Sequence, residues 1–142
     1  MSTTTIATVH KTVVVDFTPE EAFDLFTAGI ASWWPVGTHS YGGDAVTDVV
    51  FEPRAGGRVY EVTAAGEQDW ATVRSFDRPN GFVLDWLIGN ASGSEVEVRF
   101  TPEDPGARVE LEHRGFAASD PRERYATGWD VVLAPYAERA SR

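Results

Sequence analysis

The sequence predicts an α+β fold in which a curved antiparallel β-sheet wraps around one long C-terminal α-helix. Most of the chain between residues 46 and 116 has the pattern of successive β-strands separated by turns rich in Gly and Pro. The last quarter instead carries aromatic and aliphatic side chains at helical spacing. A sheet with one solvated face must bury the other, and this amphipathic helix is the element extensive enough to cover it.

The first strand is expected over residues 6–16, which are rich in β-branched side chains and follow a flexible leader at residues 1–5. The run Thr18-Pro19-Glu20-Glu21 then supplies an N-cap, a Pro at the first helical position and a Glu three residues after the cap. A short helix should therefore follow and end near Gly29. A second helical turn is expected over residues 30–34, before Pro35.

Further strands are expected over residues 46–52, 58–63, 69–76, 82–88, 94–101 and 107–113. Residues 35–44 form a loop of Gly, Ser, Thr, His and Tyr that is a candidate portal to an internal space. The final helix is expected to be capped by Ser119-Asp120-Pro121 and to run to about Arg139, with a bend at Pro135. The whole chain, residues 1–142, fits a single domain.

Composition limits the kinds of partner that the chain can bind. The net charge is -10, and phosphate backbones and anionic membranes are therefore disfavoured as partners. The chain has no Cys, which excludes disulfides and thiolate chemistry, and no apolar run has the length of a membrane span. We expect a cytoplasmic protein with no nucleic-acid, membrane or cofactor partner. His10, His39 and His113 lack the short spacing of metal ligands, so no metal site is expected.

His113 is the sharpest candidate for chemistry. It shares strand parity with Val109 and Leu111 and should point to the apolar side of the sheet, whereas Glu112 and Arg114 should face water. A buried imidazole close to the final helix is able to orient a polar ligand group or to act as a general acid or base, with Tyr125 as its partner. The more frequent role of such a residue is structural, because buried polar groups are normally paired within the protein.

Aromatic residues suggest a pocket between the sheet and the final helix. The chain contains 5 Trp among 142 residues, more than packing of a domain of this size requires. Trp86 shares a face with Phe82 and Leu84, and Trp129 follows Tyr125 by one helical turn. Such rings either line a pocket or fill the core, and the sequence favours neither over the other. The residues expected to contact a ligand are Trp34, His39, Tyr60, Trp70, Trp86, His113, Tyr125, Trp129 and Leu133.

Several motifs, in their order along the chain, resemble the helix-grip (START-like, SRPBCC) superfamily. The matching segments include Thr18-Pro19-Glu20-Glu21-Ala22-Phe23, Trp33-Trp34, Arg54-Ala55-Gly56-Gly57-Arg58, Phe82-Val83-Leu84-Asp85-Trp86, Leu111-Glu112-His113-Arg114-Gly115-Phe116 and Gly128-Trp129-Asp130-Val131-Val132-Leu133. Within that superfamily the chain resembles the family named after the activator of the Hsp90 ATPase. The resemblance implies a ligand site between the concave sheet and the C-terminal helix.

The resemblance leaves three functions open, because this fold serves lipid and hormone carriers, polyketide cyclases and co-chaperone domains. The first is binding of a small, largely apolar or aromatic ligand in the cavity. The second is an enzyme of the polyketide cyclase, dehydratase or hydrolase type that uses the same cavity, although nothing in the sequence requires turnover. The third is a co-chaperone-like module that binds a chaperone. A homodimer is compatible with each of these functions.

Overall fold

The computed structural model describes residues 8–87, 93–115 and 122–142. Its strands are β1 (Val9–Val15), β2 (Asp48–Phe51), β3 (Arg58–Thr63), β4 (Gly66–Asp77), β5 (Gly81–Trp86), β6 (Ser94–Glu103) and β7 (Gly106–Arg114). Its helices are α1 (Pro19–Phe26) and α2 (Arg122–Arg139), and single 3-10 turns form η1 (Ile30–Ser32) and η2 (Gly43–Ala45).

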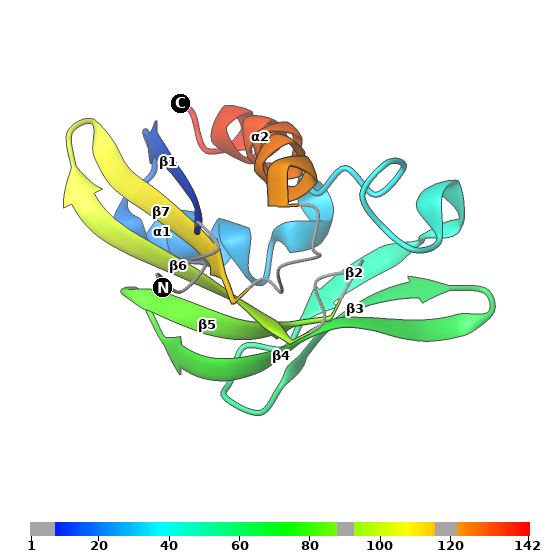
Figure 1. Cartoon of the computed structure of the whole chain (residues 1–142). Coiled ribbons are helices and arrows are strands. Elements are labelled where there is room, and N and C mark those ends of the chain that lie inside the picture. Colours follow the sequence, from blue (N-terminus) through cyan, green and yellow to red (C-terminus); the bar gives the residue numbers. More distant parts are fainter. Residues whose placement is uncertain (1–7, 88–92, 116–121) are drawn as a thin grey trace, which may run out of the picture.

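All strands join one antiparallel sheet in the order β1-β7-β6-β5-β4-β3-β2. The sheet curves, and α2 lies across its concave side together with α1 and η1 (Figure 1). This arrangement confirms the predicted helix-grip architecture. Chain order explains it, since each strand from β2 to β7 pairs with the next along the sequence and β1 then pairs with β7.

The element boundaries differ from prediction in a few places. The strand β4 begins at Gly66 rather than at residue 69, because the β3-β4 hairpin is tight enough to pair Thr63 with Gly66. The strand β2 is shorter than residues 46–52, since the preceding loop ends in the unpredicted turn η2. The predicted cap at residues 119–121, the flexible leader and the last residue of the predicted strand 82–88 lie outside the described residues.

The start of α1 has the predicted capping box. The Glu21 amide donates to Thr18 Oγ1 at 3.2 Å, and the Thr18 amide donates to Glu21 Oε1 at 3.0 Å. Pro19 occupies the first turn, where a missing backbone N–H costs no helical hydrogen bond. This local signal therefore fixes where the chain leaves β1 and begins the helix on the concave side of the sheet.

Irregularities in β4 shape the concave face. Pairing with β3 shifts register between Val59 and Tyr60, so Trp70 is an extra residue opposite that step. Trp70 and Ala71 are consequently both buried although they are adjacent in the strand. A bulge of this kind bends a strand and increases its twist. It therefore directs the Trp70 ring into the space beneath α2.

One stripe of α2 covers the sheet, and its members recur at helical spacing: Trp129, Val132, Leu133 and Tyr136. The buried Ala140 continues the stripe just after the helix. Its C-terminal end is fixed to the end of β1, because the Ala140 carbonyl accepts the amides of Asp16 and Phe17 at 3.1 and 3.2 Å. Pro135 lies within the helix.

Aromatic residues divide the core into two regions. Phenylalanine rings gather beneath α1, where Phe23 contacts Phe76, Phe82 and Phe100 edge to face at 5.1 to 5.9 Å. The indoles of Trp34, Trp70, Trp86 and Trp129 gather beneath the first half of α2. The contact of Trp33 with Trp34 at 5.6 Å joins the regions. Four of the buried indole N–H groups therefore lie at one end of the core.

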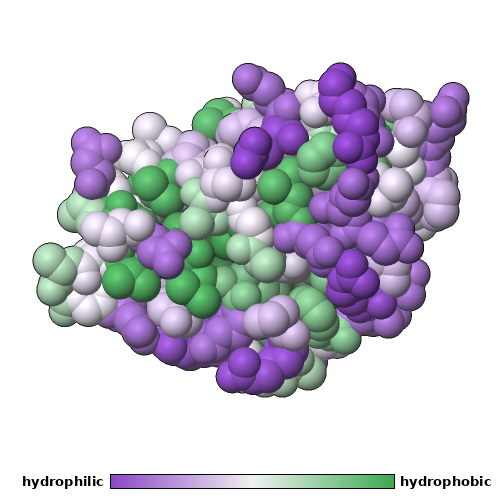
Figure 2. Space-filling model, turned by 180° about the vertical axis from the view of Figure 1, so that it is seen from behind, coloured by the Kyte–Doolittle hydropathy of each residue, from purple (hydrophilic) through white to green (hydrophobic). Residues whose placement is uncertain are grey.

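Arg side chains pair with carboxylates on the convex face of the sheet. Arg114 Nη2 lies 2.7 Å from Glu95 Oε1, and Arg114 Nη1 lies 2.9 Å from Glu97 Oε1. Arg99 Nη2 lies 2.9 Å from Glu112 Oε2. These pairs confirm that Glu112 and Arg114 lie on the solvated face of the sheet. From the side opposite to Figure 1, hydrophilic side chains cover the right of the molecule, and apolar ones reach the surface at the left and centre (Figure 2).

We predict that Tyr136→Phe lowers the free energy of unfolding by about 1 kcal/mol, because the buried Tyr136 hydroxyl donates to the Ala22 carbonyl at 2.9 Å and the variant loses this bond. Chemical denaturation measures the change. Tyr41→Phe is the matched control, since Tyr41 is 50% exposed and its hydroxyl lies at the longer distance of 3.3 Å from the Leu87 carbonyl. Equal stability of Tyr136→Phe and the native chain would contradict the prediction.

Candidate functional site

The candidate site lies where the ends of β5, β6 and β7 meet the first half of α2. We call it the aromatic site and define it by Trp34, Trp70, Trp86, His113, Tyr125 and Trp129. Its rings form a continuous set of contacts with centroid distances between 4.9 and 6.1 Å. Strand parity directs Trp86 and His113 inward, the β4 bulge directs Trp70 inward, and helical spacing places Tyr125 and Trp129 above them.

His113 is fully buried and links the sheet to α2. Trp129 Nε1 donates to His113 Nδ1 at 3.1 Å, and His113 Nε2 lies 2.7 Å from Ser94 Oγ. An indole N–H is a donor only, so Nδ1 must be the unprotonated nitrogen. The neutral ring therefore carries its proton on Nε2 and donates it to the Ser94 oxygen.

Burial lowers the pKa of His113 from 6.5 to about 4, because the charged imidazolium loses its hydration inside the core. The ring is consequently neutral near pH 7. Both of its nitrogens hold protein partners, and a base of such low pKa takes up protons poorly at that pH. In this arrangement His113 acts as a connector and positioning residue rather than as a ready general base.

A buried carboxylate beside the aromatic site was not anticipated from the sequence. Glu61 is 1% exposed, and its oxygens accept from Trp70 Nε1 at 2.7 Å, the Tyr41 amide at 2.8 Å and the Gly42 amide at 2.7 Å. Its parity with Val59 is the sequence signal that places it inside. We name residues 35–45 the strap, because Glu61 ties this loop to the sheet. The strap is therefore anchored, and its predicted role as a portal remains a prediction.

The strap also reaches α2. The His39 carbonyl accepts from Trp34 Nε1 at 2.7 Å. The His39 ring lies next to Gly128, since a Cβ at that glycine would be 3.7 Å from His39 Nε2. His39 therefore borders the aromatic site. Trp33 and Trp34 follow η1 and touch each other, but their other ring contacts differ. Trp33 turns toward Phe26 and Tyr136, and Trp34 turns toward Trp70.

One expected ligand contact, Tyr60, lies away from these rings. Tyr60 is on the opposite face of β3, where its ring packs under the Arg58 guanidinium at 4.1 Å, so its inclusion in the site is wrong. Its strand parity is that of Arg58 and opposite to that of the buried Val59. Leu133 is buried in the α2 stripe.

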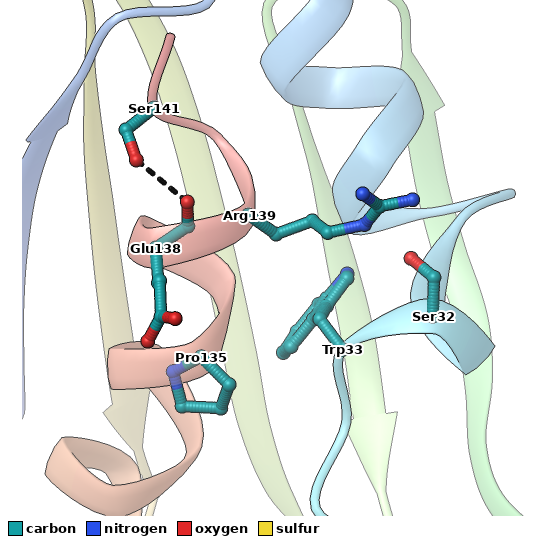
Figure 3. Close-up of a pocket in the computed structure, with 6 residues that line it drawn as sticks. All are labelled: Ser32, Trp33, Pro135, Glu138, Arg139 and Ser141. Atoms are coloured by element: carbon teal, nitrogen blue, oxygen red, sulfur yellow. Dashed lines mark hydrogen bonds between the residues drawn. The ribbon is translucent and has the colours of Figure 1, made fainter.

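A surface hollow of about 450 Å³ lies elsewhere, between η1 and the last turns of α2. Its lining mixes polar side chains with Trp33 and Pro135, and Arg139 extends across it toward Ser32 (Figure 3). Ser141 Oγ donates to the Glu138 carbonyl at 2.6 Å on its far side. None of the residues predicted to contact a ligand lines this hollow.

Comparison with known proteins identifies the family. The family described as activator of Hsp90 ATPase homolog 1-like protein matches residues 16–138. The chain belongs to this family. The match begins at the end of β1 and extends nearly to the end of α2, so it includes every element of the aromatic site. No curated protein matches the chain.

Solved structures share the fold over nearly the whole chain. An anthrahydroquino-gamma-pyrone synthase, Txn09, complexed with SUM, is 30% identical with a TM-score of 0.61, and the match covers 94% of this chain and 97% of that one. The Aha1 dimer from Colwellia psychrerythraea is 15% identical with a TM-score of 0.72 and coverage of 95% and 96%. Protein CV1439 from Chromobacterium violaceum is 18% identical with a TM-score of 0.71 and coverage of 94% and 96%.

Among the described residues, no helix is sufficiently long and apolar to cross a membrane. In the same part of the chain, no group of three or more His, Cys, Asp or Glu side chains converges in a way that would hold a metal ion.

We predict that acid destabilises the protein partly through His113. In the unfolded chain this group protonates near pH 6.5, whereas in the folded chain it stays neutral to about pH 4. Below pH 6.5 the unfolded state binds more protons, so stability falls as pH drops toward 4, by roughly 3 kcal/mol in total. Denaturation curves between about pH 7 and 4 measure the slope.

His113→Gln should flatten that slope, since a Gln carbonyl can accept from Trp129 and its amide can donate to Ser94 without titrating. A stability difference between variant and native chain that is the same at all these pH values would contradict the assignment. Imidazole nitrogen shifts should independently show the tautomer protonated at Nε2.

We also predict that Glu61→Gln loosens the strap. The neutral amide loses charge-assisted bonds to the Tyr41 and Gly42 amides, and each such bond contributes about 1.5 to 3 kcal/mol. Hydrogen exchange at both amides should accelerate at least about tenfold. Glu67→Gln is the control, because Glu67 is exposed and pairs with Arg58 on the outer face. Unchanged protection of Tyr41 and Gly42 in Glu61→Gln would show that Glu61 does not hold the strap.

Proposed function

We propose that this protein binds a small, flat, largely apolar molecule between the concave face of the sheet and α2, at the aromatic site. The observation that carries the proposal is the concentration of indole rings from β4, β5, α2 and the segment after η1 around one buried imidazole. Indoles offer broad apolar faces for stacking together with polar N–H groups that set orientation.

The 30% identical synthase supports this class of ligand, because that protein is described as an anthrahydroquino-gamma-pyrone synthase and was solved complexed with SUM. A fused-ring molecule has the shape that stacked indoles accept. When such a molecule binds, contacts between the ligand and the rings of Trp34, Trp86 and Trp129 would replace the present ring–ring contacts with similar geometry.

In this proposal the ligand enters beside the strap. Tyr41 and Leu87 are exposed there, and the Tyr41 hydroxyl donates to the Leu87 carbonyl at 3.3 Å. A hydrogen bond of this length is weak. The inner anchor on Glu61 is strong by comparison, so the strap is able to open at its outer edge while remaining attached to the sheet.

Ring closure of such a molecule is the second candidate function, and the likeness to the synthase is the observation that favours it. His113 would then position Ser94 and Trp129, and Tyr125, whose ring lies 5.2 Å from His113, would be the half-buried group closest to a reacting ligand. Mass spectrometry of the released molecule separates the candidates, because ring closure with dehydration lowers its mass by one water and binding leaves it unchanged.

The co-chaperone function implied by the family description is less favoured by the described surface. The acidic strands of the convex face pair with Arg side chains instead of forming an uninterrupted patch for a basic partner. The Aha1 relative is described as a dimer, and a homodimer remains part of the proposal for this chain.

We predict that xanthene, a flat tricyclic hydrocarbon ether, binds the protein and quenches its Trp fluorescence. Trp129→Leu should weaken binding about twofold to tenfold, because a stacking partner worth about 0.5 to 1.5 kcal/mol beyond its buried area is lost. Val131→Ala is the control, since Val131 is 45% exposed on the same helix. Circular dichroism establishes that both variants fold. Equal affinity of Trp129→Leu and the native chain would place the ligand elsewhere.

A further inference from the structure

The indole N–H of Trp86 differs from every other described buried polar side-chain group. Trp86 ends β5 and is 5% exposed, with its ring packed against His113 at 5.7 Å and Trp129 at 5.4 Å. Among the described residues, its Nε1 is the one buried side-chain nitrogen or oxygen that lacks a hydrogen-bond partner. A buried donor left in this state loses its hydration without compensation.

The other indoles show that the fold normally satisfies this group. Each donates to a protein acceptor at 2.7 to 3.1 Å: Trp33 to the Leu25 carbonyl, Trp34 to the His39 carbonyl, Trp70 to Glu61 and Trp129 to His113. A Phe at position 86 would supply a ring without an unsatisfied donor. The uncompensated N–H therefore indicates an acceptor that arrives with a ligand.

We propose that Trp86 Nε1 is the specificity-determining donor of the site and that the ligand is a neutral, flat, multi-ring molecule bearing a carbonyl oxygen that accepts from it. This inference rests on the ligand-binding function proposed above. An indole N–H donates and never accepts, so it selects a ligand group that can accept, such as a carbonyl oxygen, over a group that can only donate.

Charge around the site favours a neutral carbonyl over a carboxylate. The carboxyl group of Glu61 lies beside these rings, and its Oε1 receives the Trp70 indole N–H. The chain as a whole carries a formal charge of -10. An anionic ligand would meet repulsion from both, whereas a carbonyl presents only a partial negative charge to the Trp86 donor.

The position of Trp86 suits a ligand that enters beside the strap. The next residue, Leu87, is 36% exposed, and its carbonyl faces the hydroxyl of the exposed Tyr41. Leu87 and Tyr41 form an apolar rim at the surface, one residue away from the unpartnered donor. A flat molecule passing this rim would meet the Trp86 indole first and could keep its carbonyl on Nε1 as its rings stack on Trp129.

Xanthone and xanthene test the proposal, because they share one tricyclic frame and differ by the carbonyl oxygen. Their dissociation constants are measured for the native chain and for Trp86→Phe, which keeps a ring and removes the donor. We expect Trp86→Phe to weaken xanthone about threefold to tenfold and to leave xanthene within twofold. Trp33→Phe, a Trp outside the aromatic site whose N–H is partnered, is the control and should leave the ratio of the two affinities unchanged.

The outcomes separate the two proposals. Binding of both compounds with the same ratio in Trp86→Phe and the native chain overturns the role of Trp86 and leaves ligand binding in place. Failure of both compounds to bind the native chain overturns the proposed function and this inference together.

Nuclear magnetic resonance provides a test that does not depend on the folding of Trp86→Phe. The Trp86 indole proton of the native chain should move downfield when xanthone is added and show little change with xanthene. A Trp86 proton that moves equally with both compounds would contradict a hydrogen bond to the carbonyl.

Discussion

The requirement that the concave face of a seven-stranded sheet be covered governs the rest of this structure. The buried stripe of α2 supplies the cover together with α1 and η1, so every polar group beneath it loses water and needs a partner within the protein. Ser94, His113 and Trp129 meet this need by linking two strands to the helix through one neutral imidazole. Glu61 meets it by collecting N–H donors from the strap and from Trp70.

Because buried polar groups need partners, the two ends of the core serve different roles. Phenylalanine rings beneath α1 have no polar atoms to satisfy, so they form a packing region alone. Indoles and His113 beneath the first half of α2 combine apolar faces with directional donors, which is the composition of a recognition site. The Trp86 donor stands out against this background because the surrounding structure satisfies its counterparts.

Much of the fold followed from local sequence signals. The capping box at Thr18, the parity of the last strands and the spacing of the α2 stripe each act over a few residues, and the structure confirms them. The same strand alternation predicted that the side chains of His113 and Trp86 point inward. The structure places Tyr60 outside the aromatic site and Glu61 inside the core, and both directions follow from the alternation of β3.

The sequence by itself determined the element order, the inward faces of the strands and the chemical character of the aromatic site, since these depend on short-range periodicity. Only the tertiary structure decided which nitrogen of His113 is protonated, how Glu61 holds the strap and which indole lacks an acceptor. These properties depend on hydrogen bonds between residues on different elements, such as Trp70 with Glu61 across the β3-β4 hairpin and Trp129 with His113 from helix to sheet. Trp129 and His113 become neighbours only when α2 packs against the curved sheet.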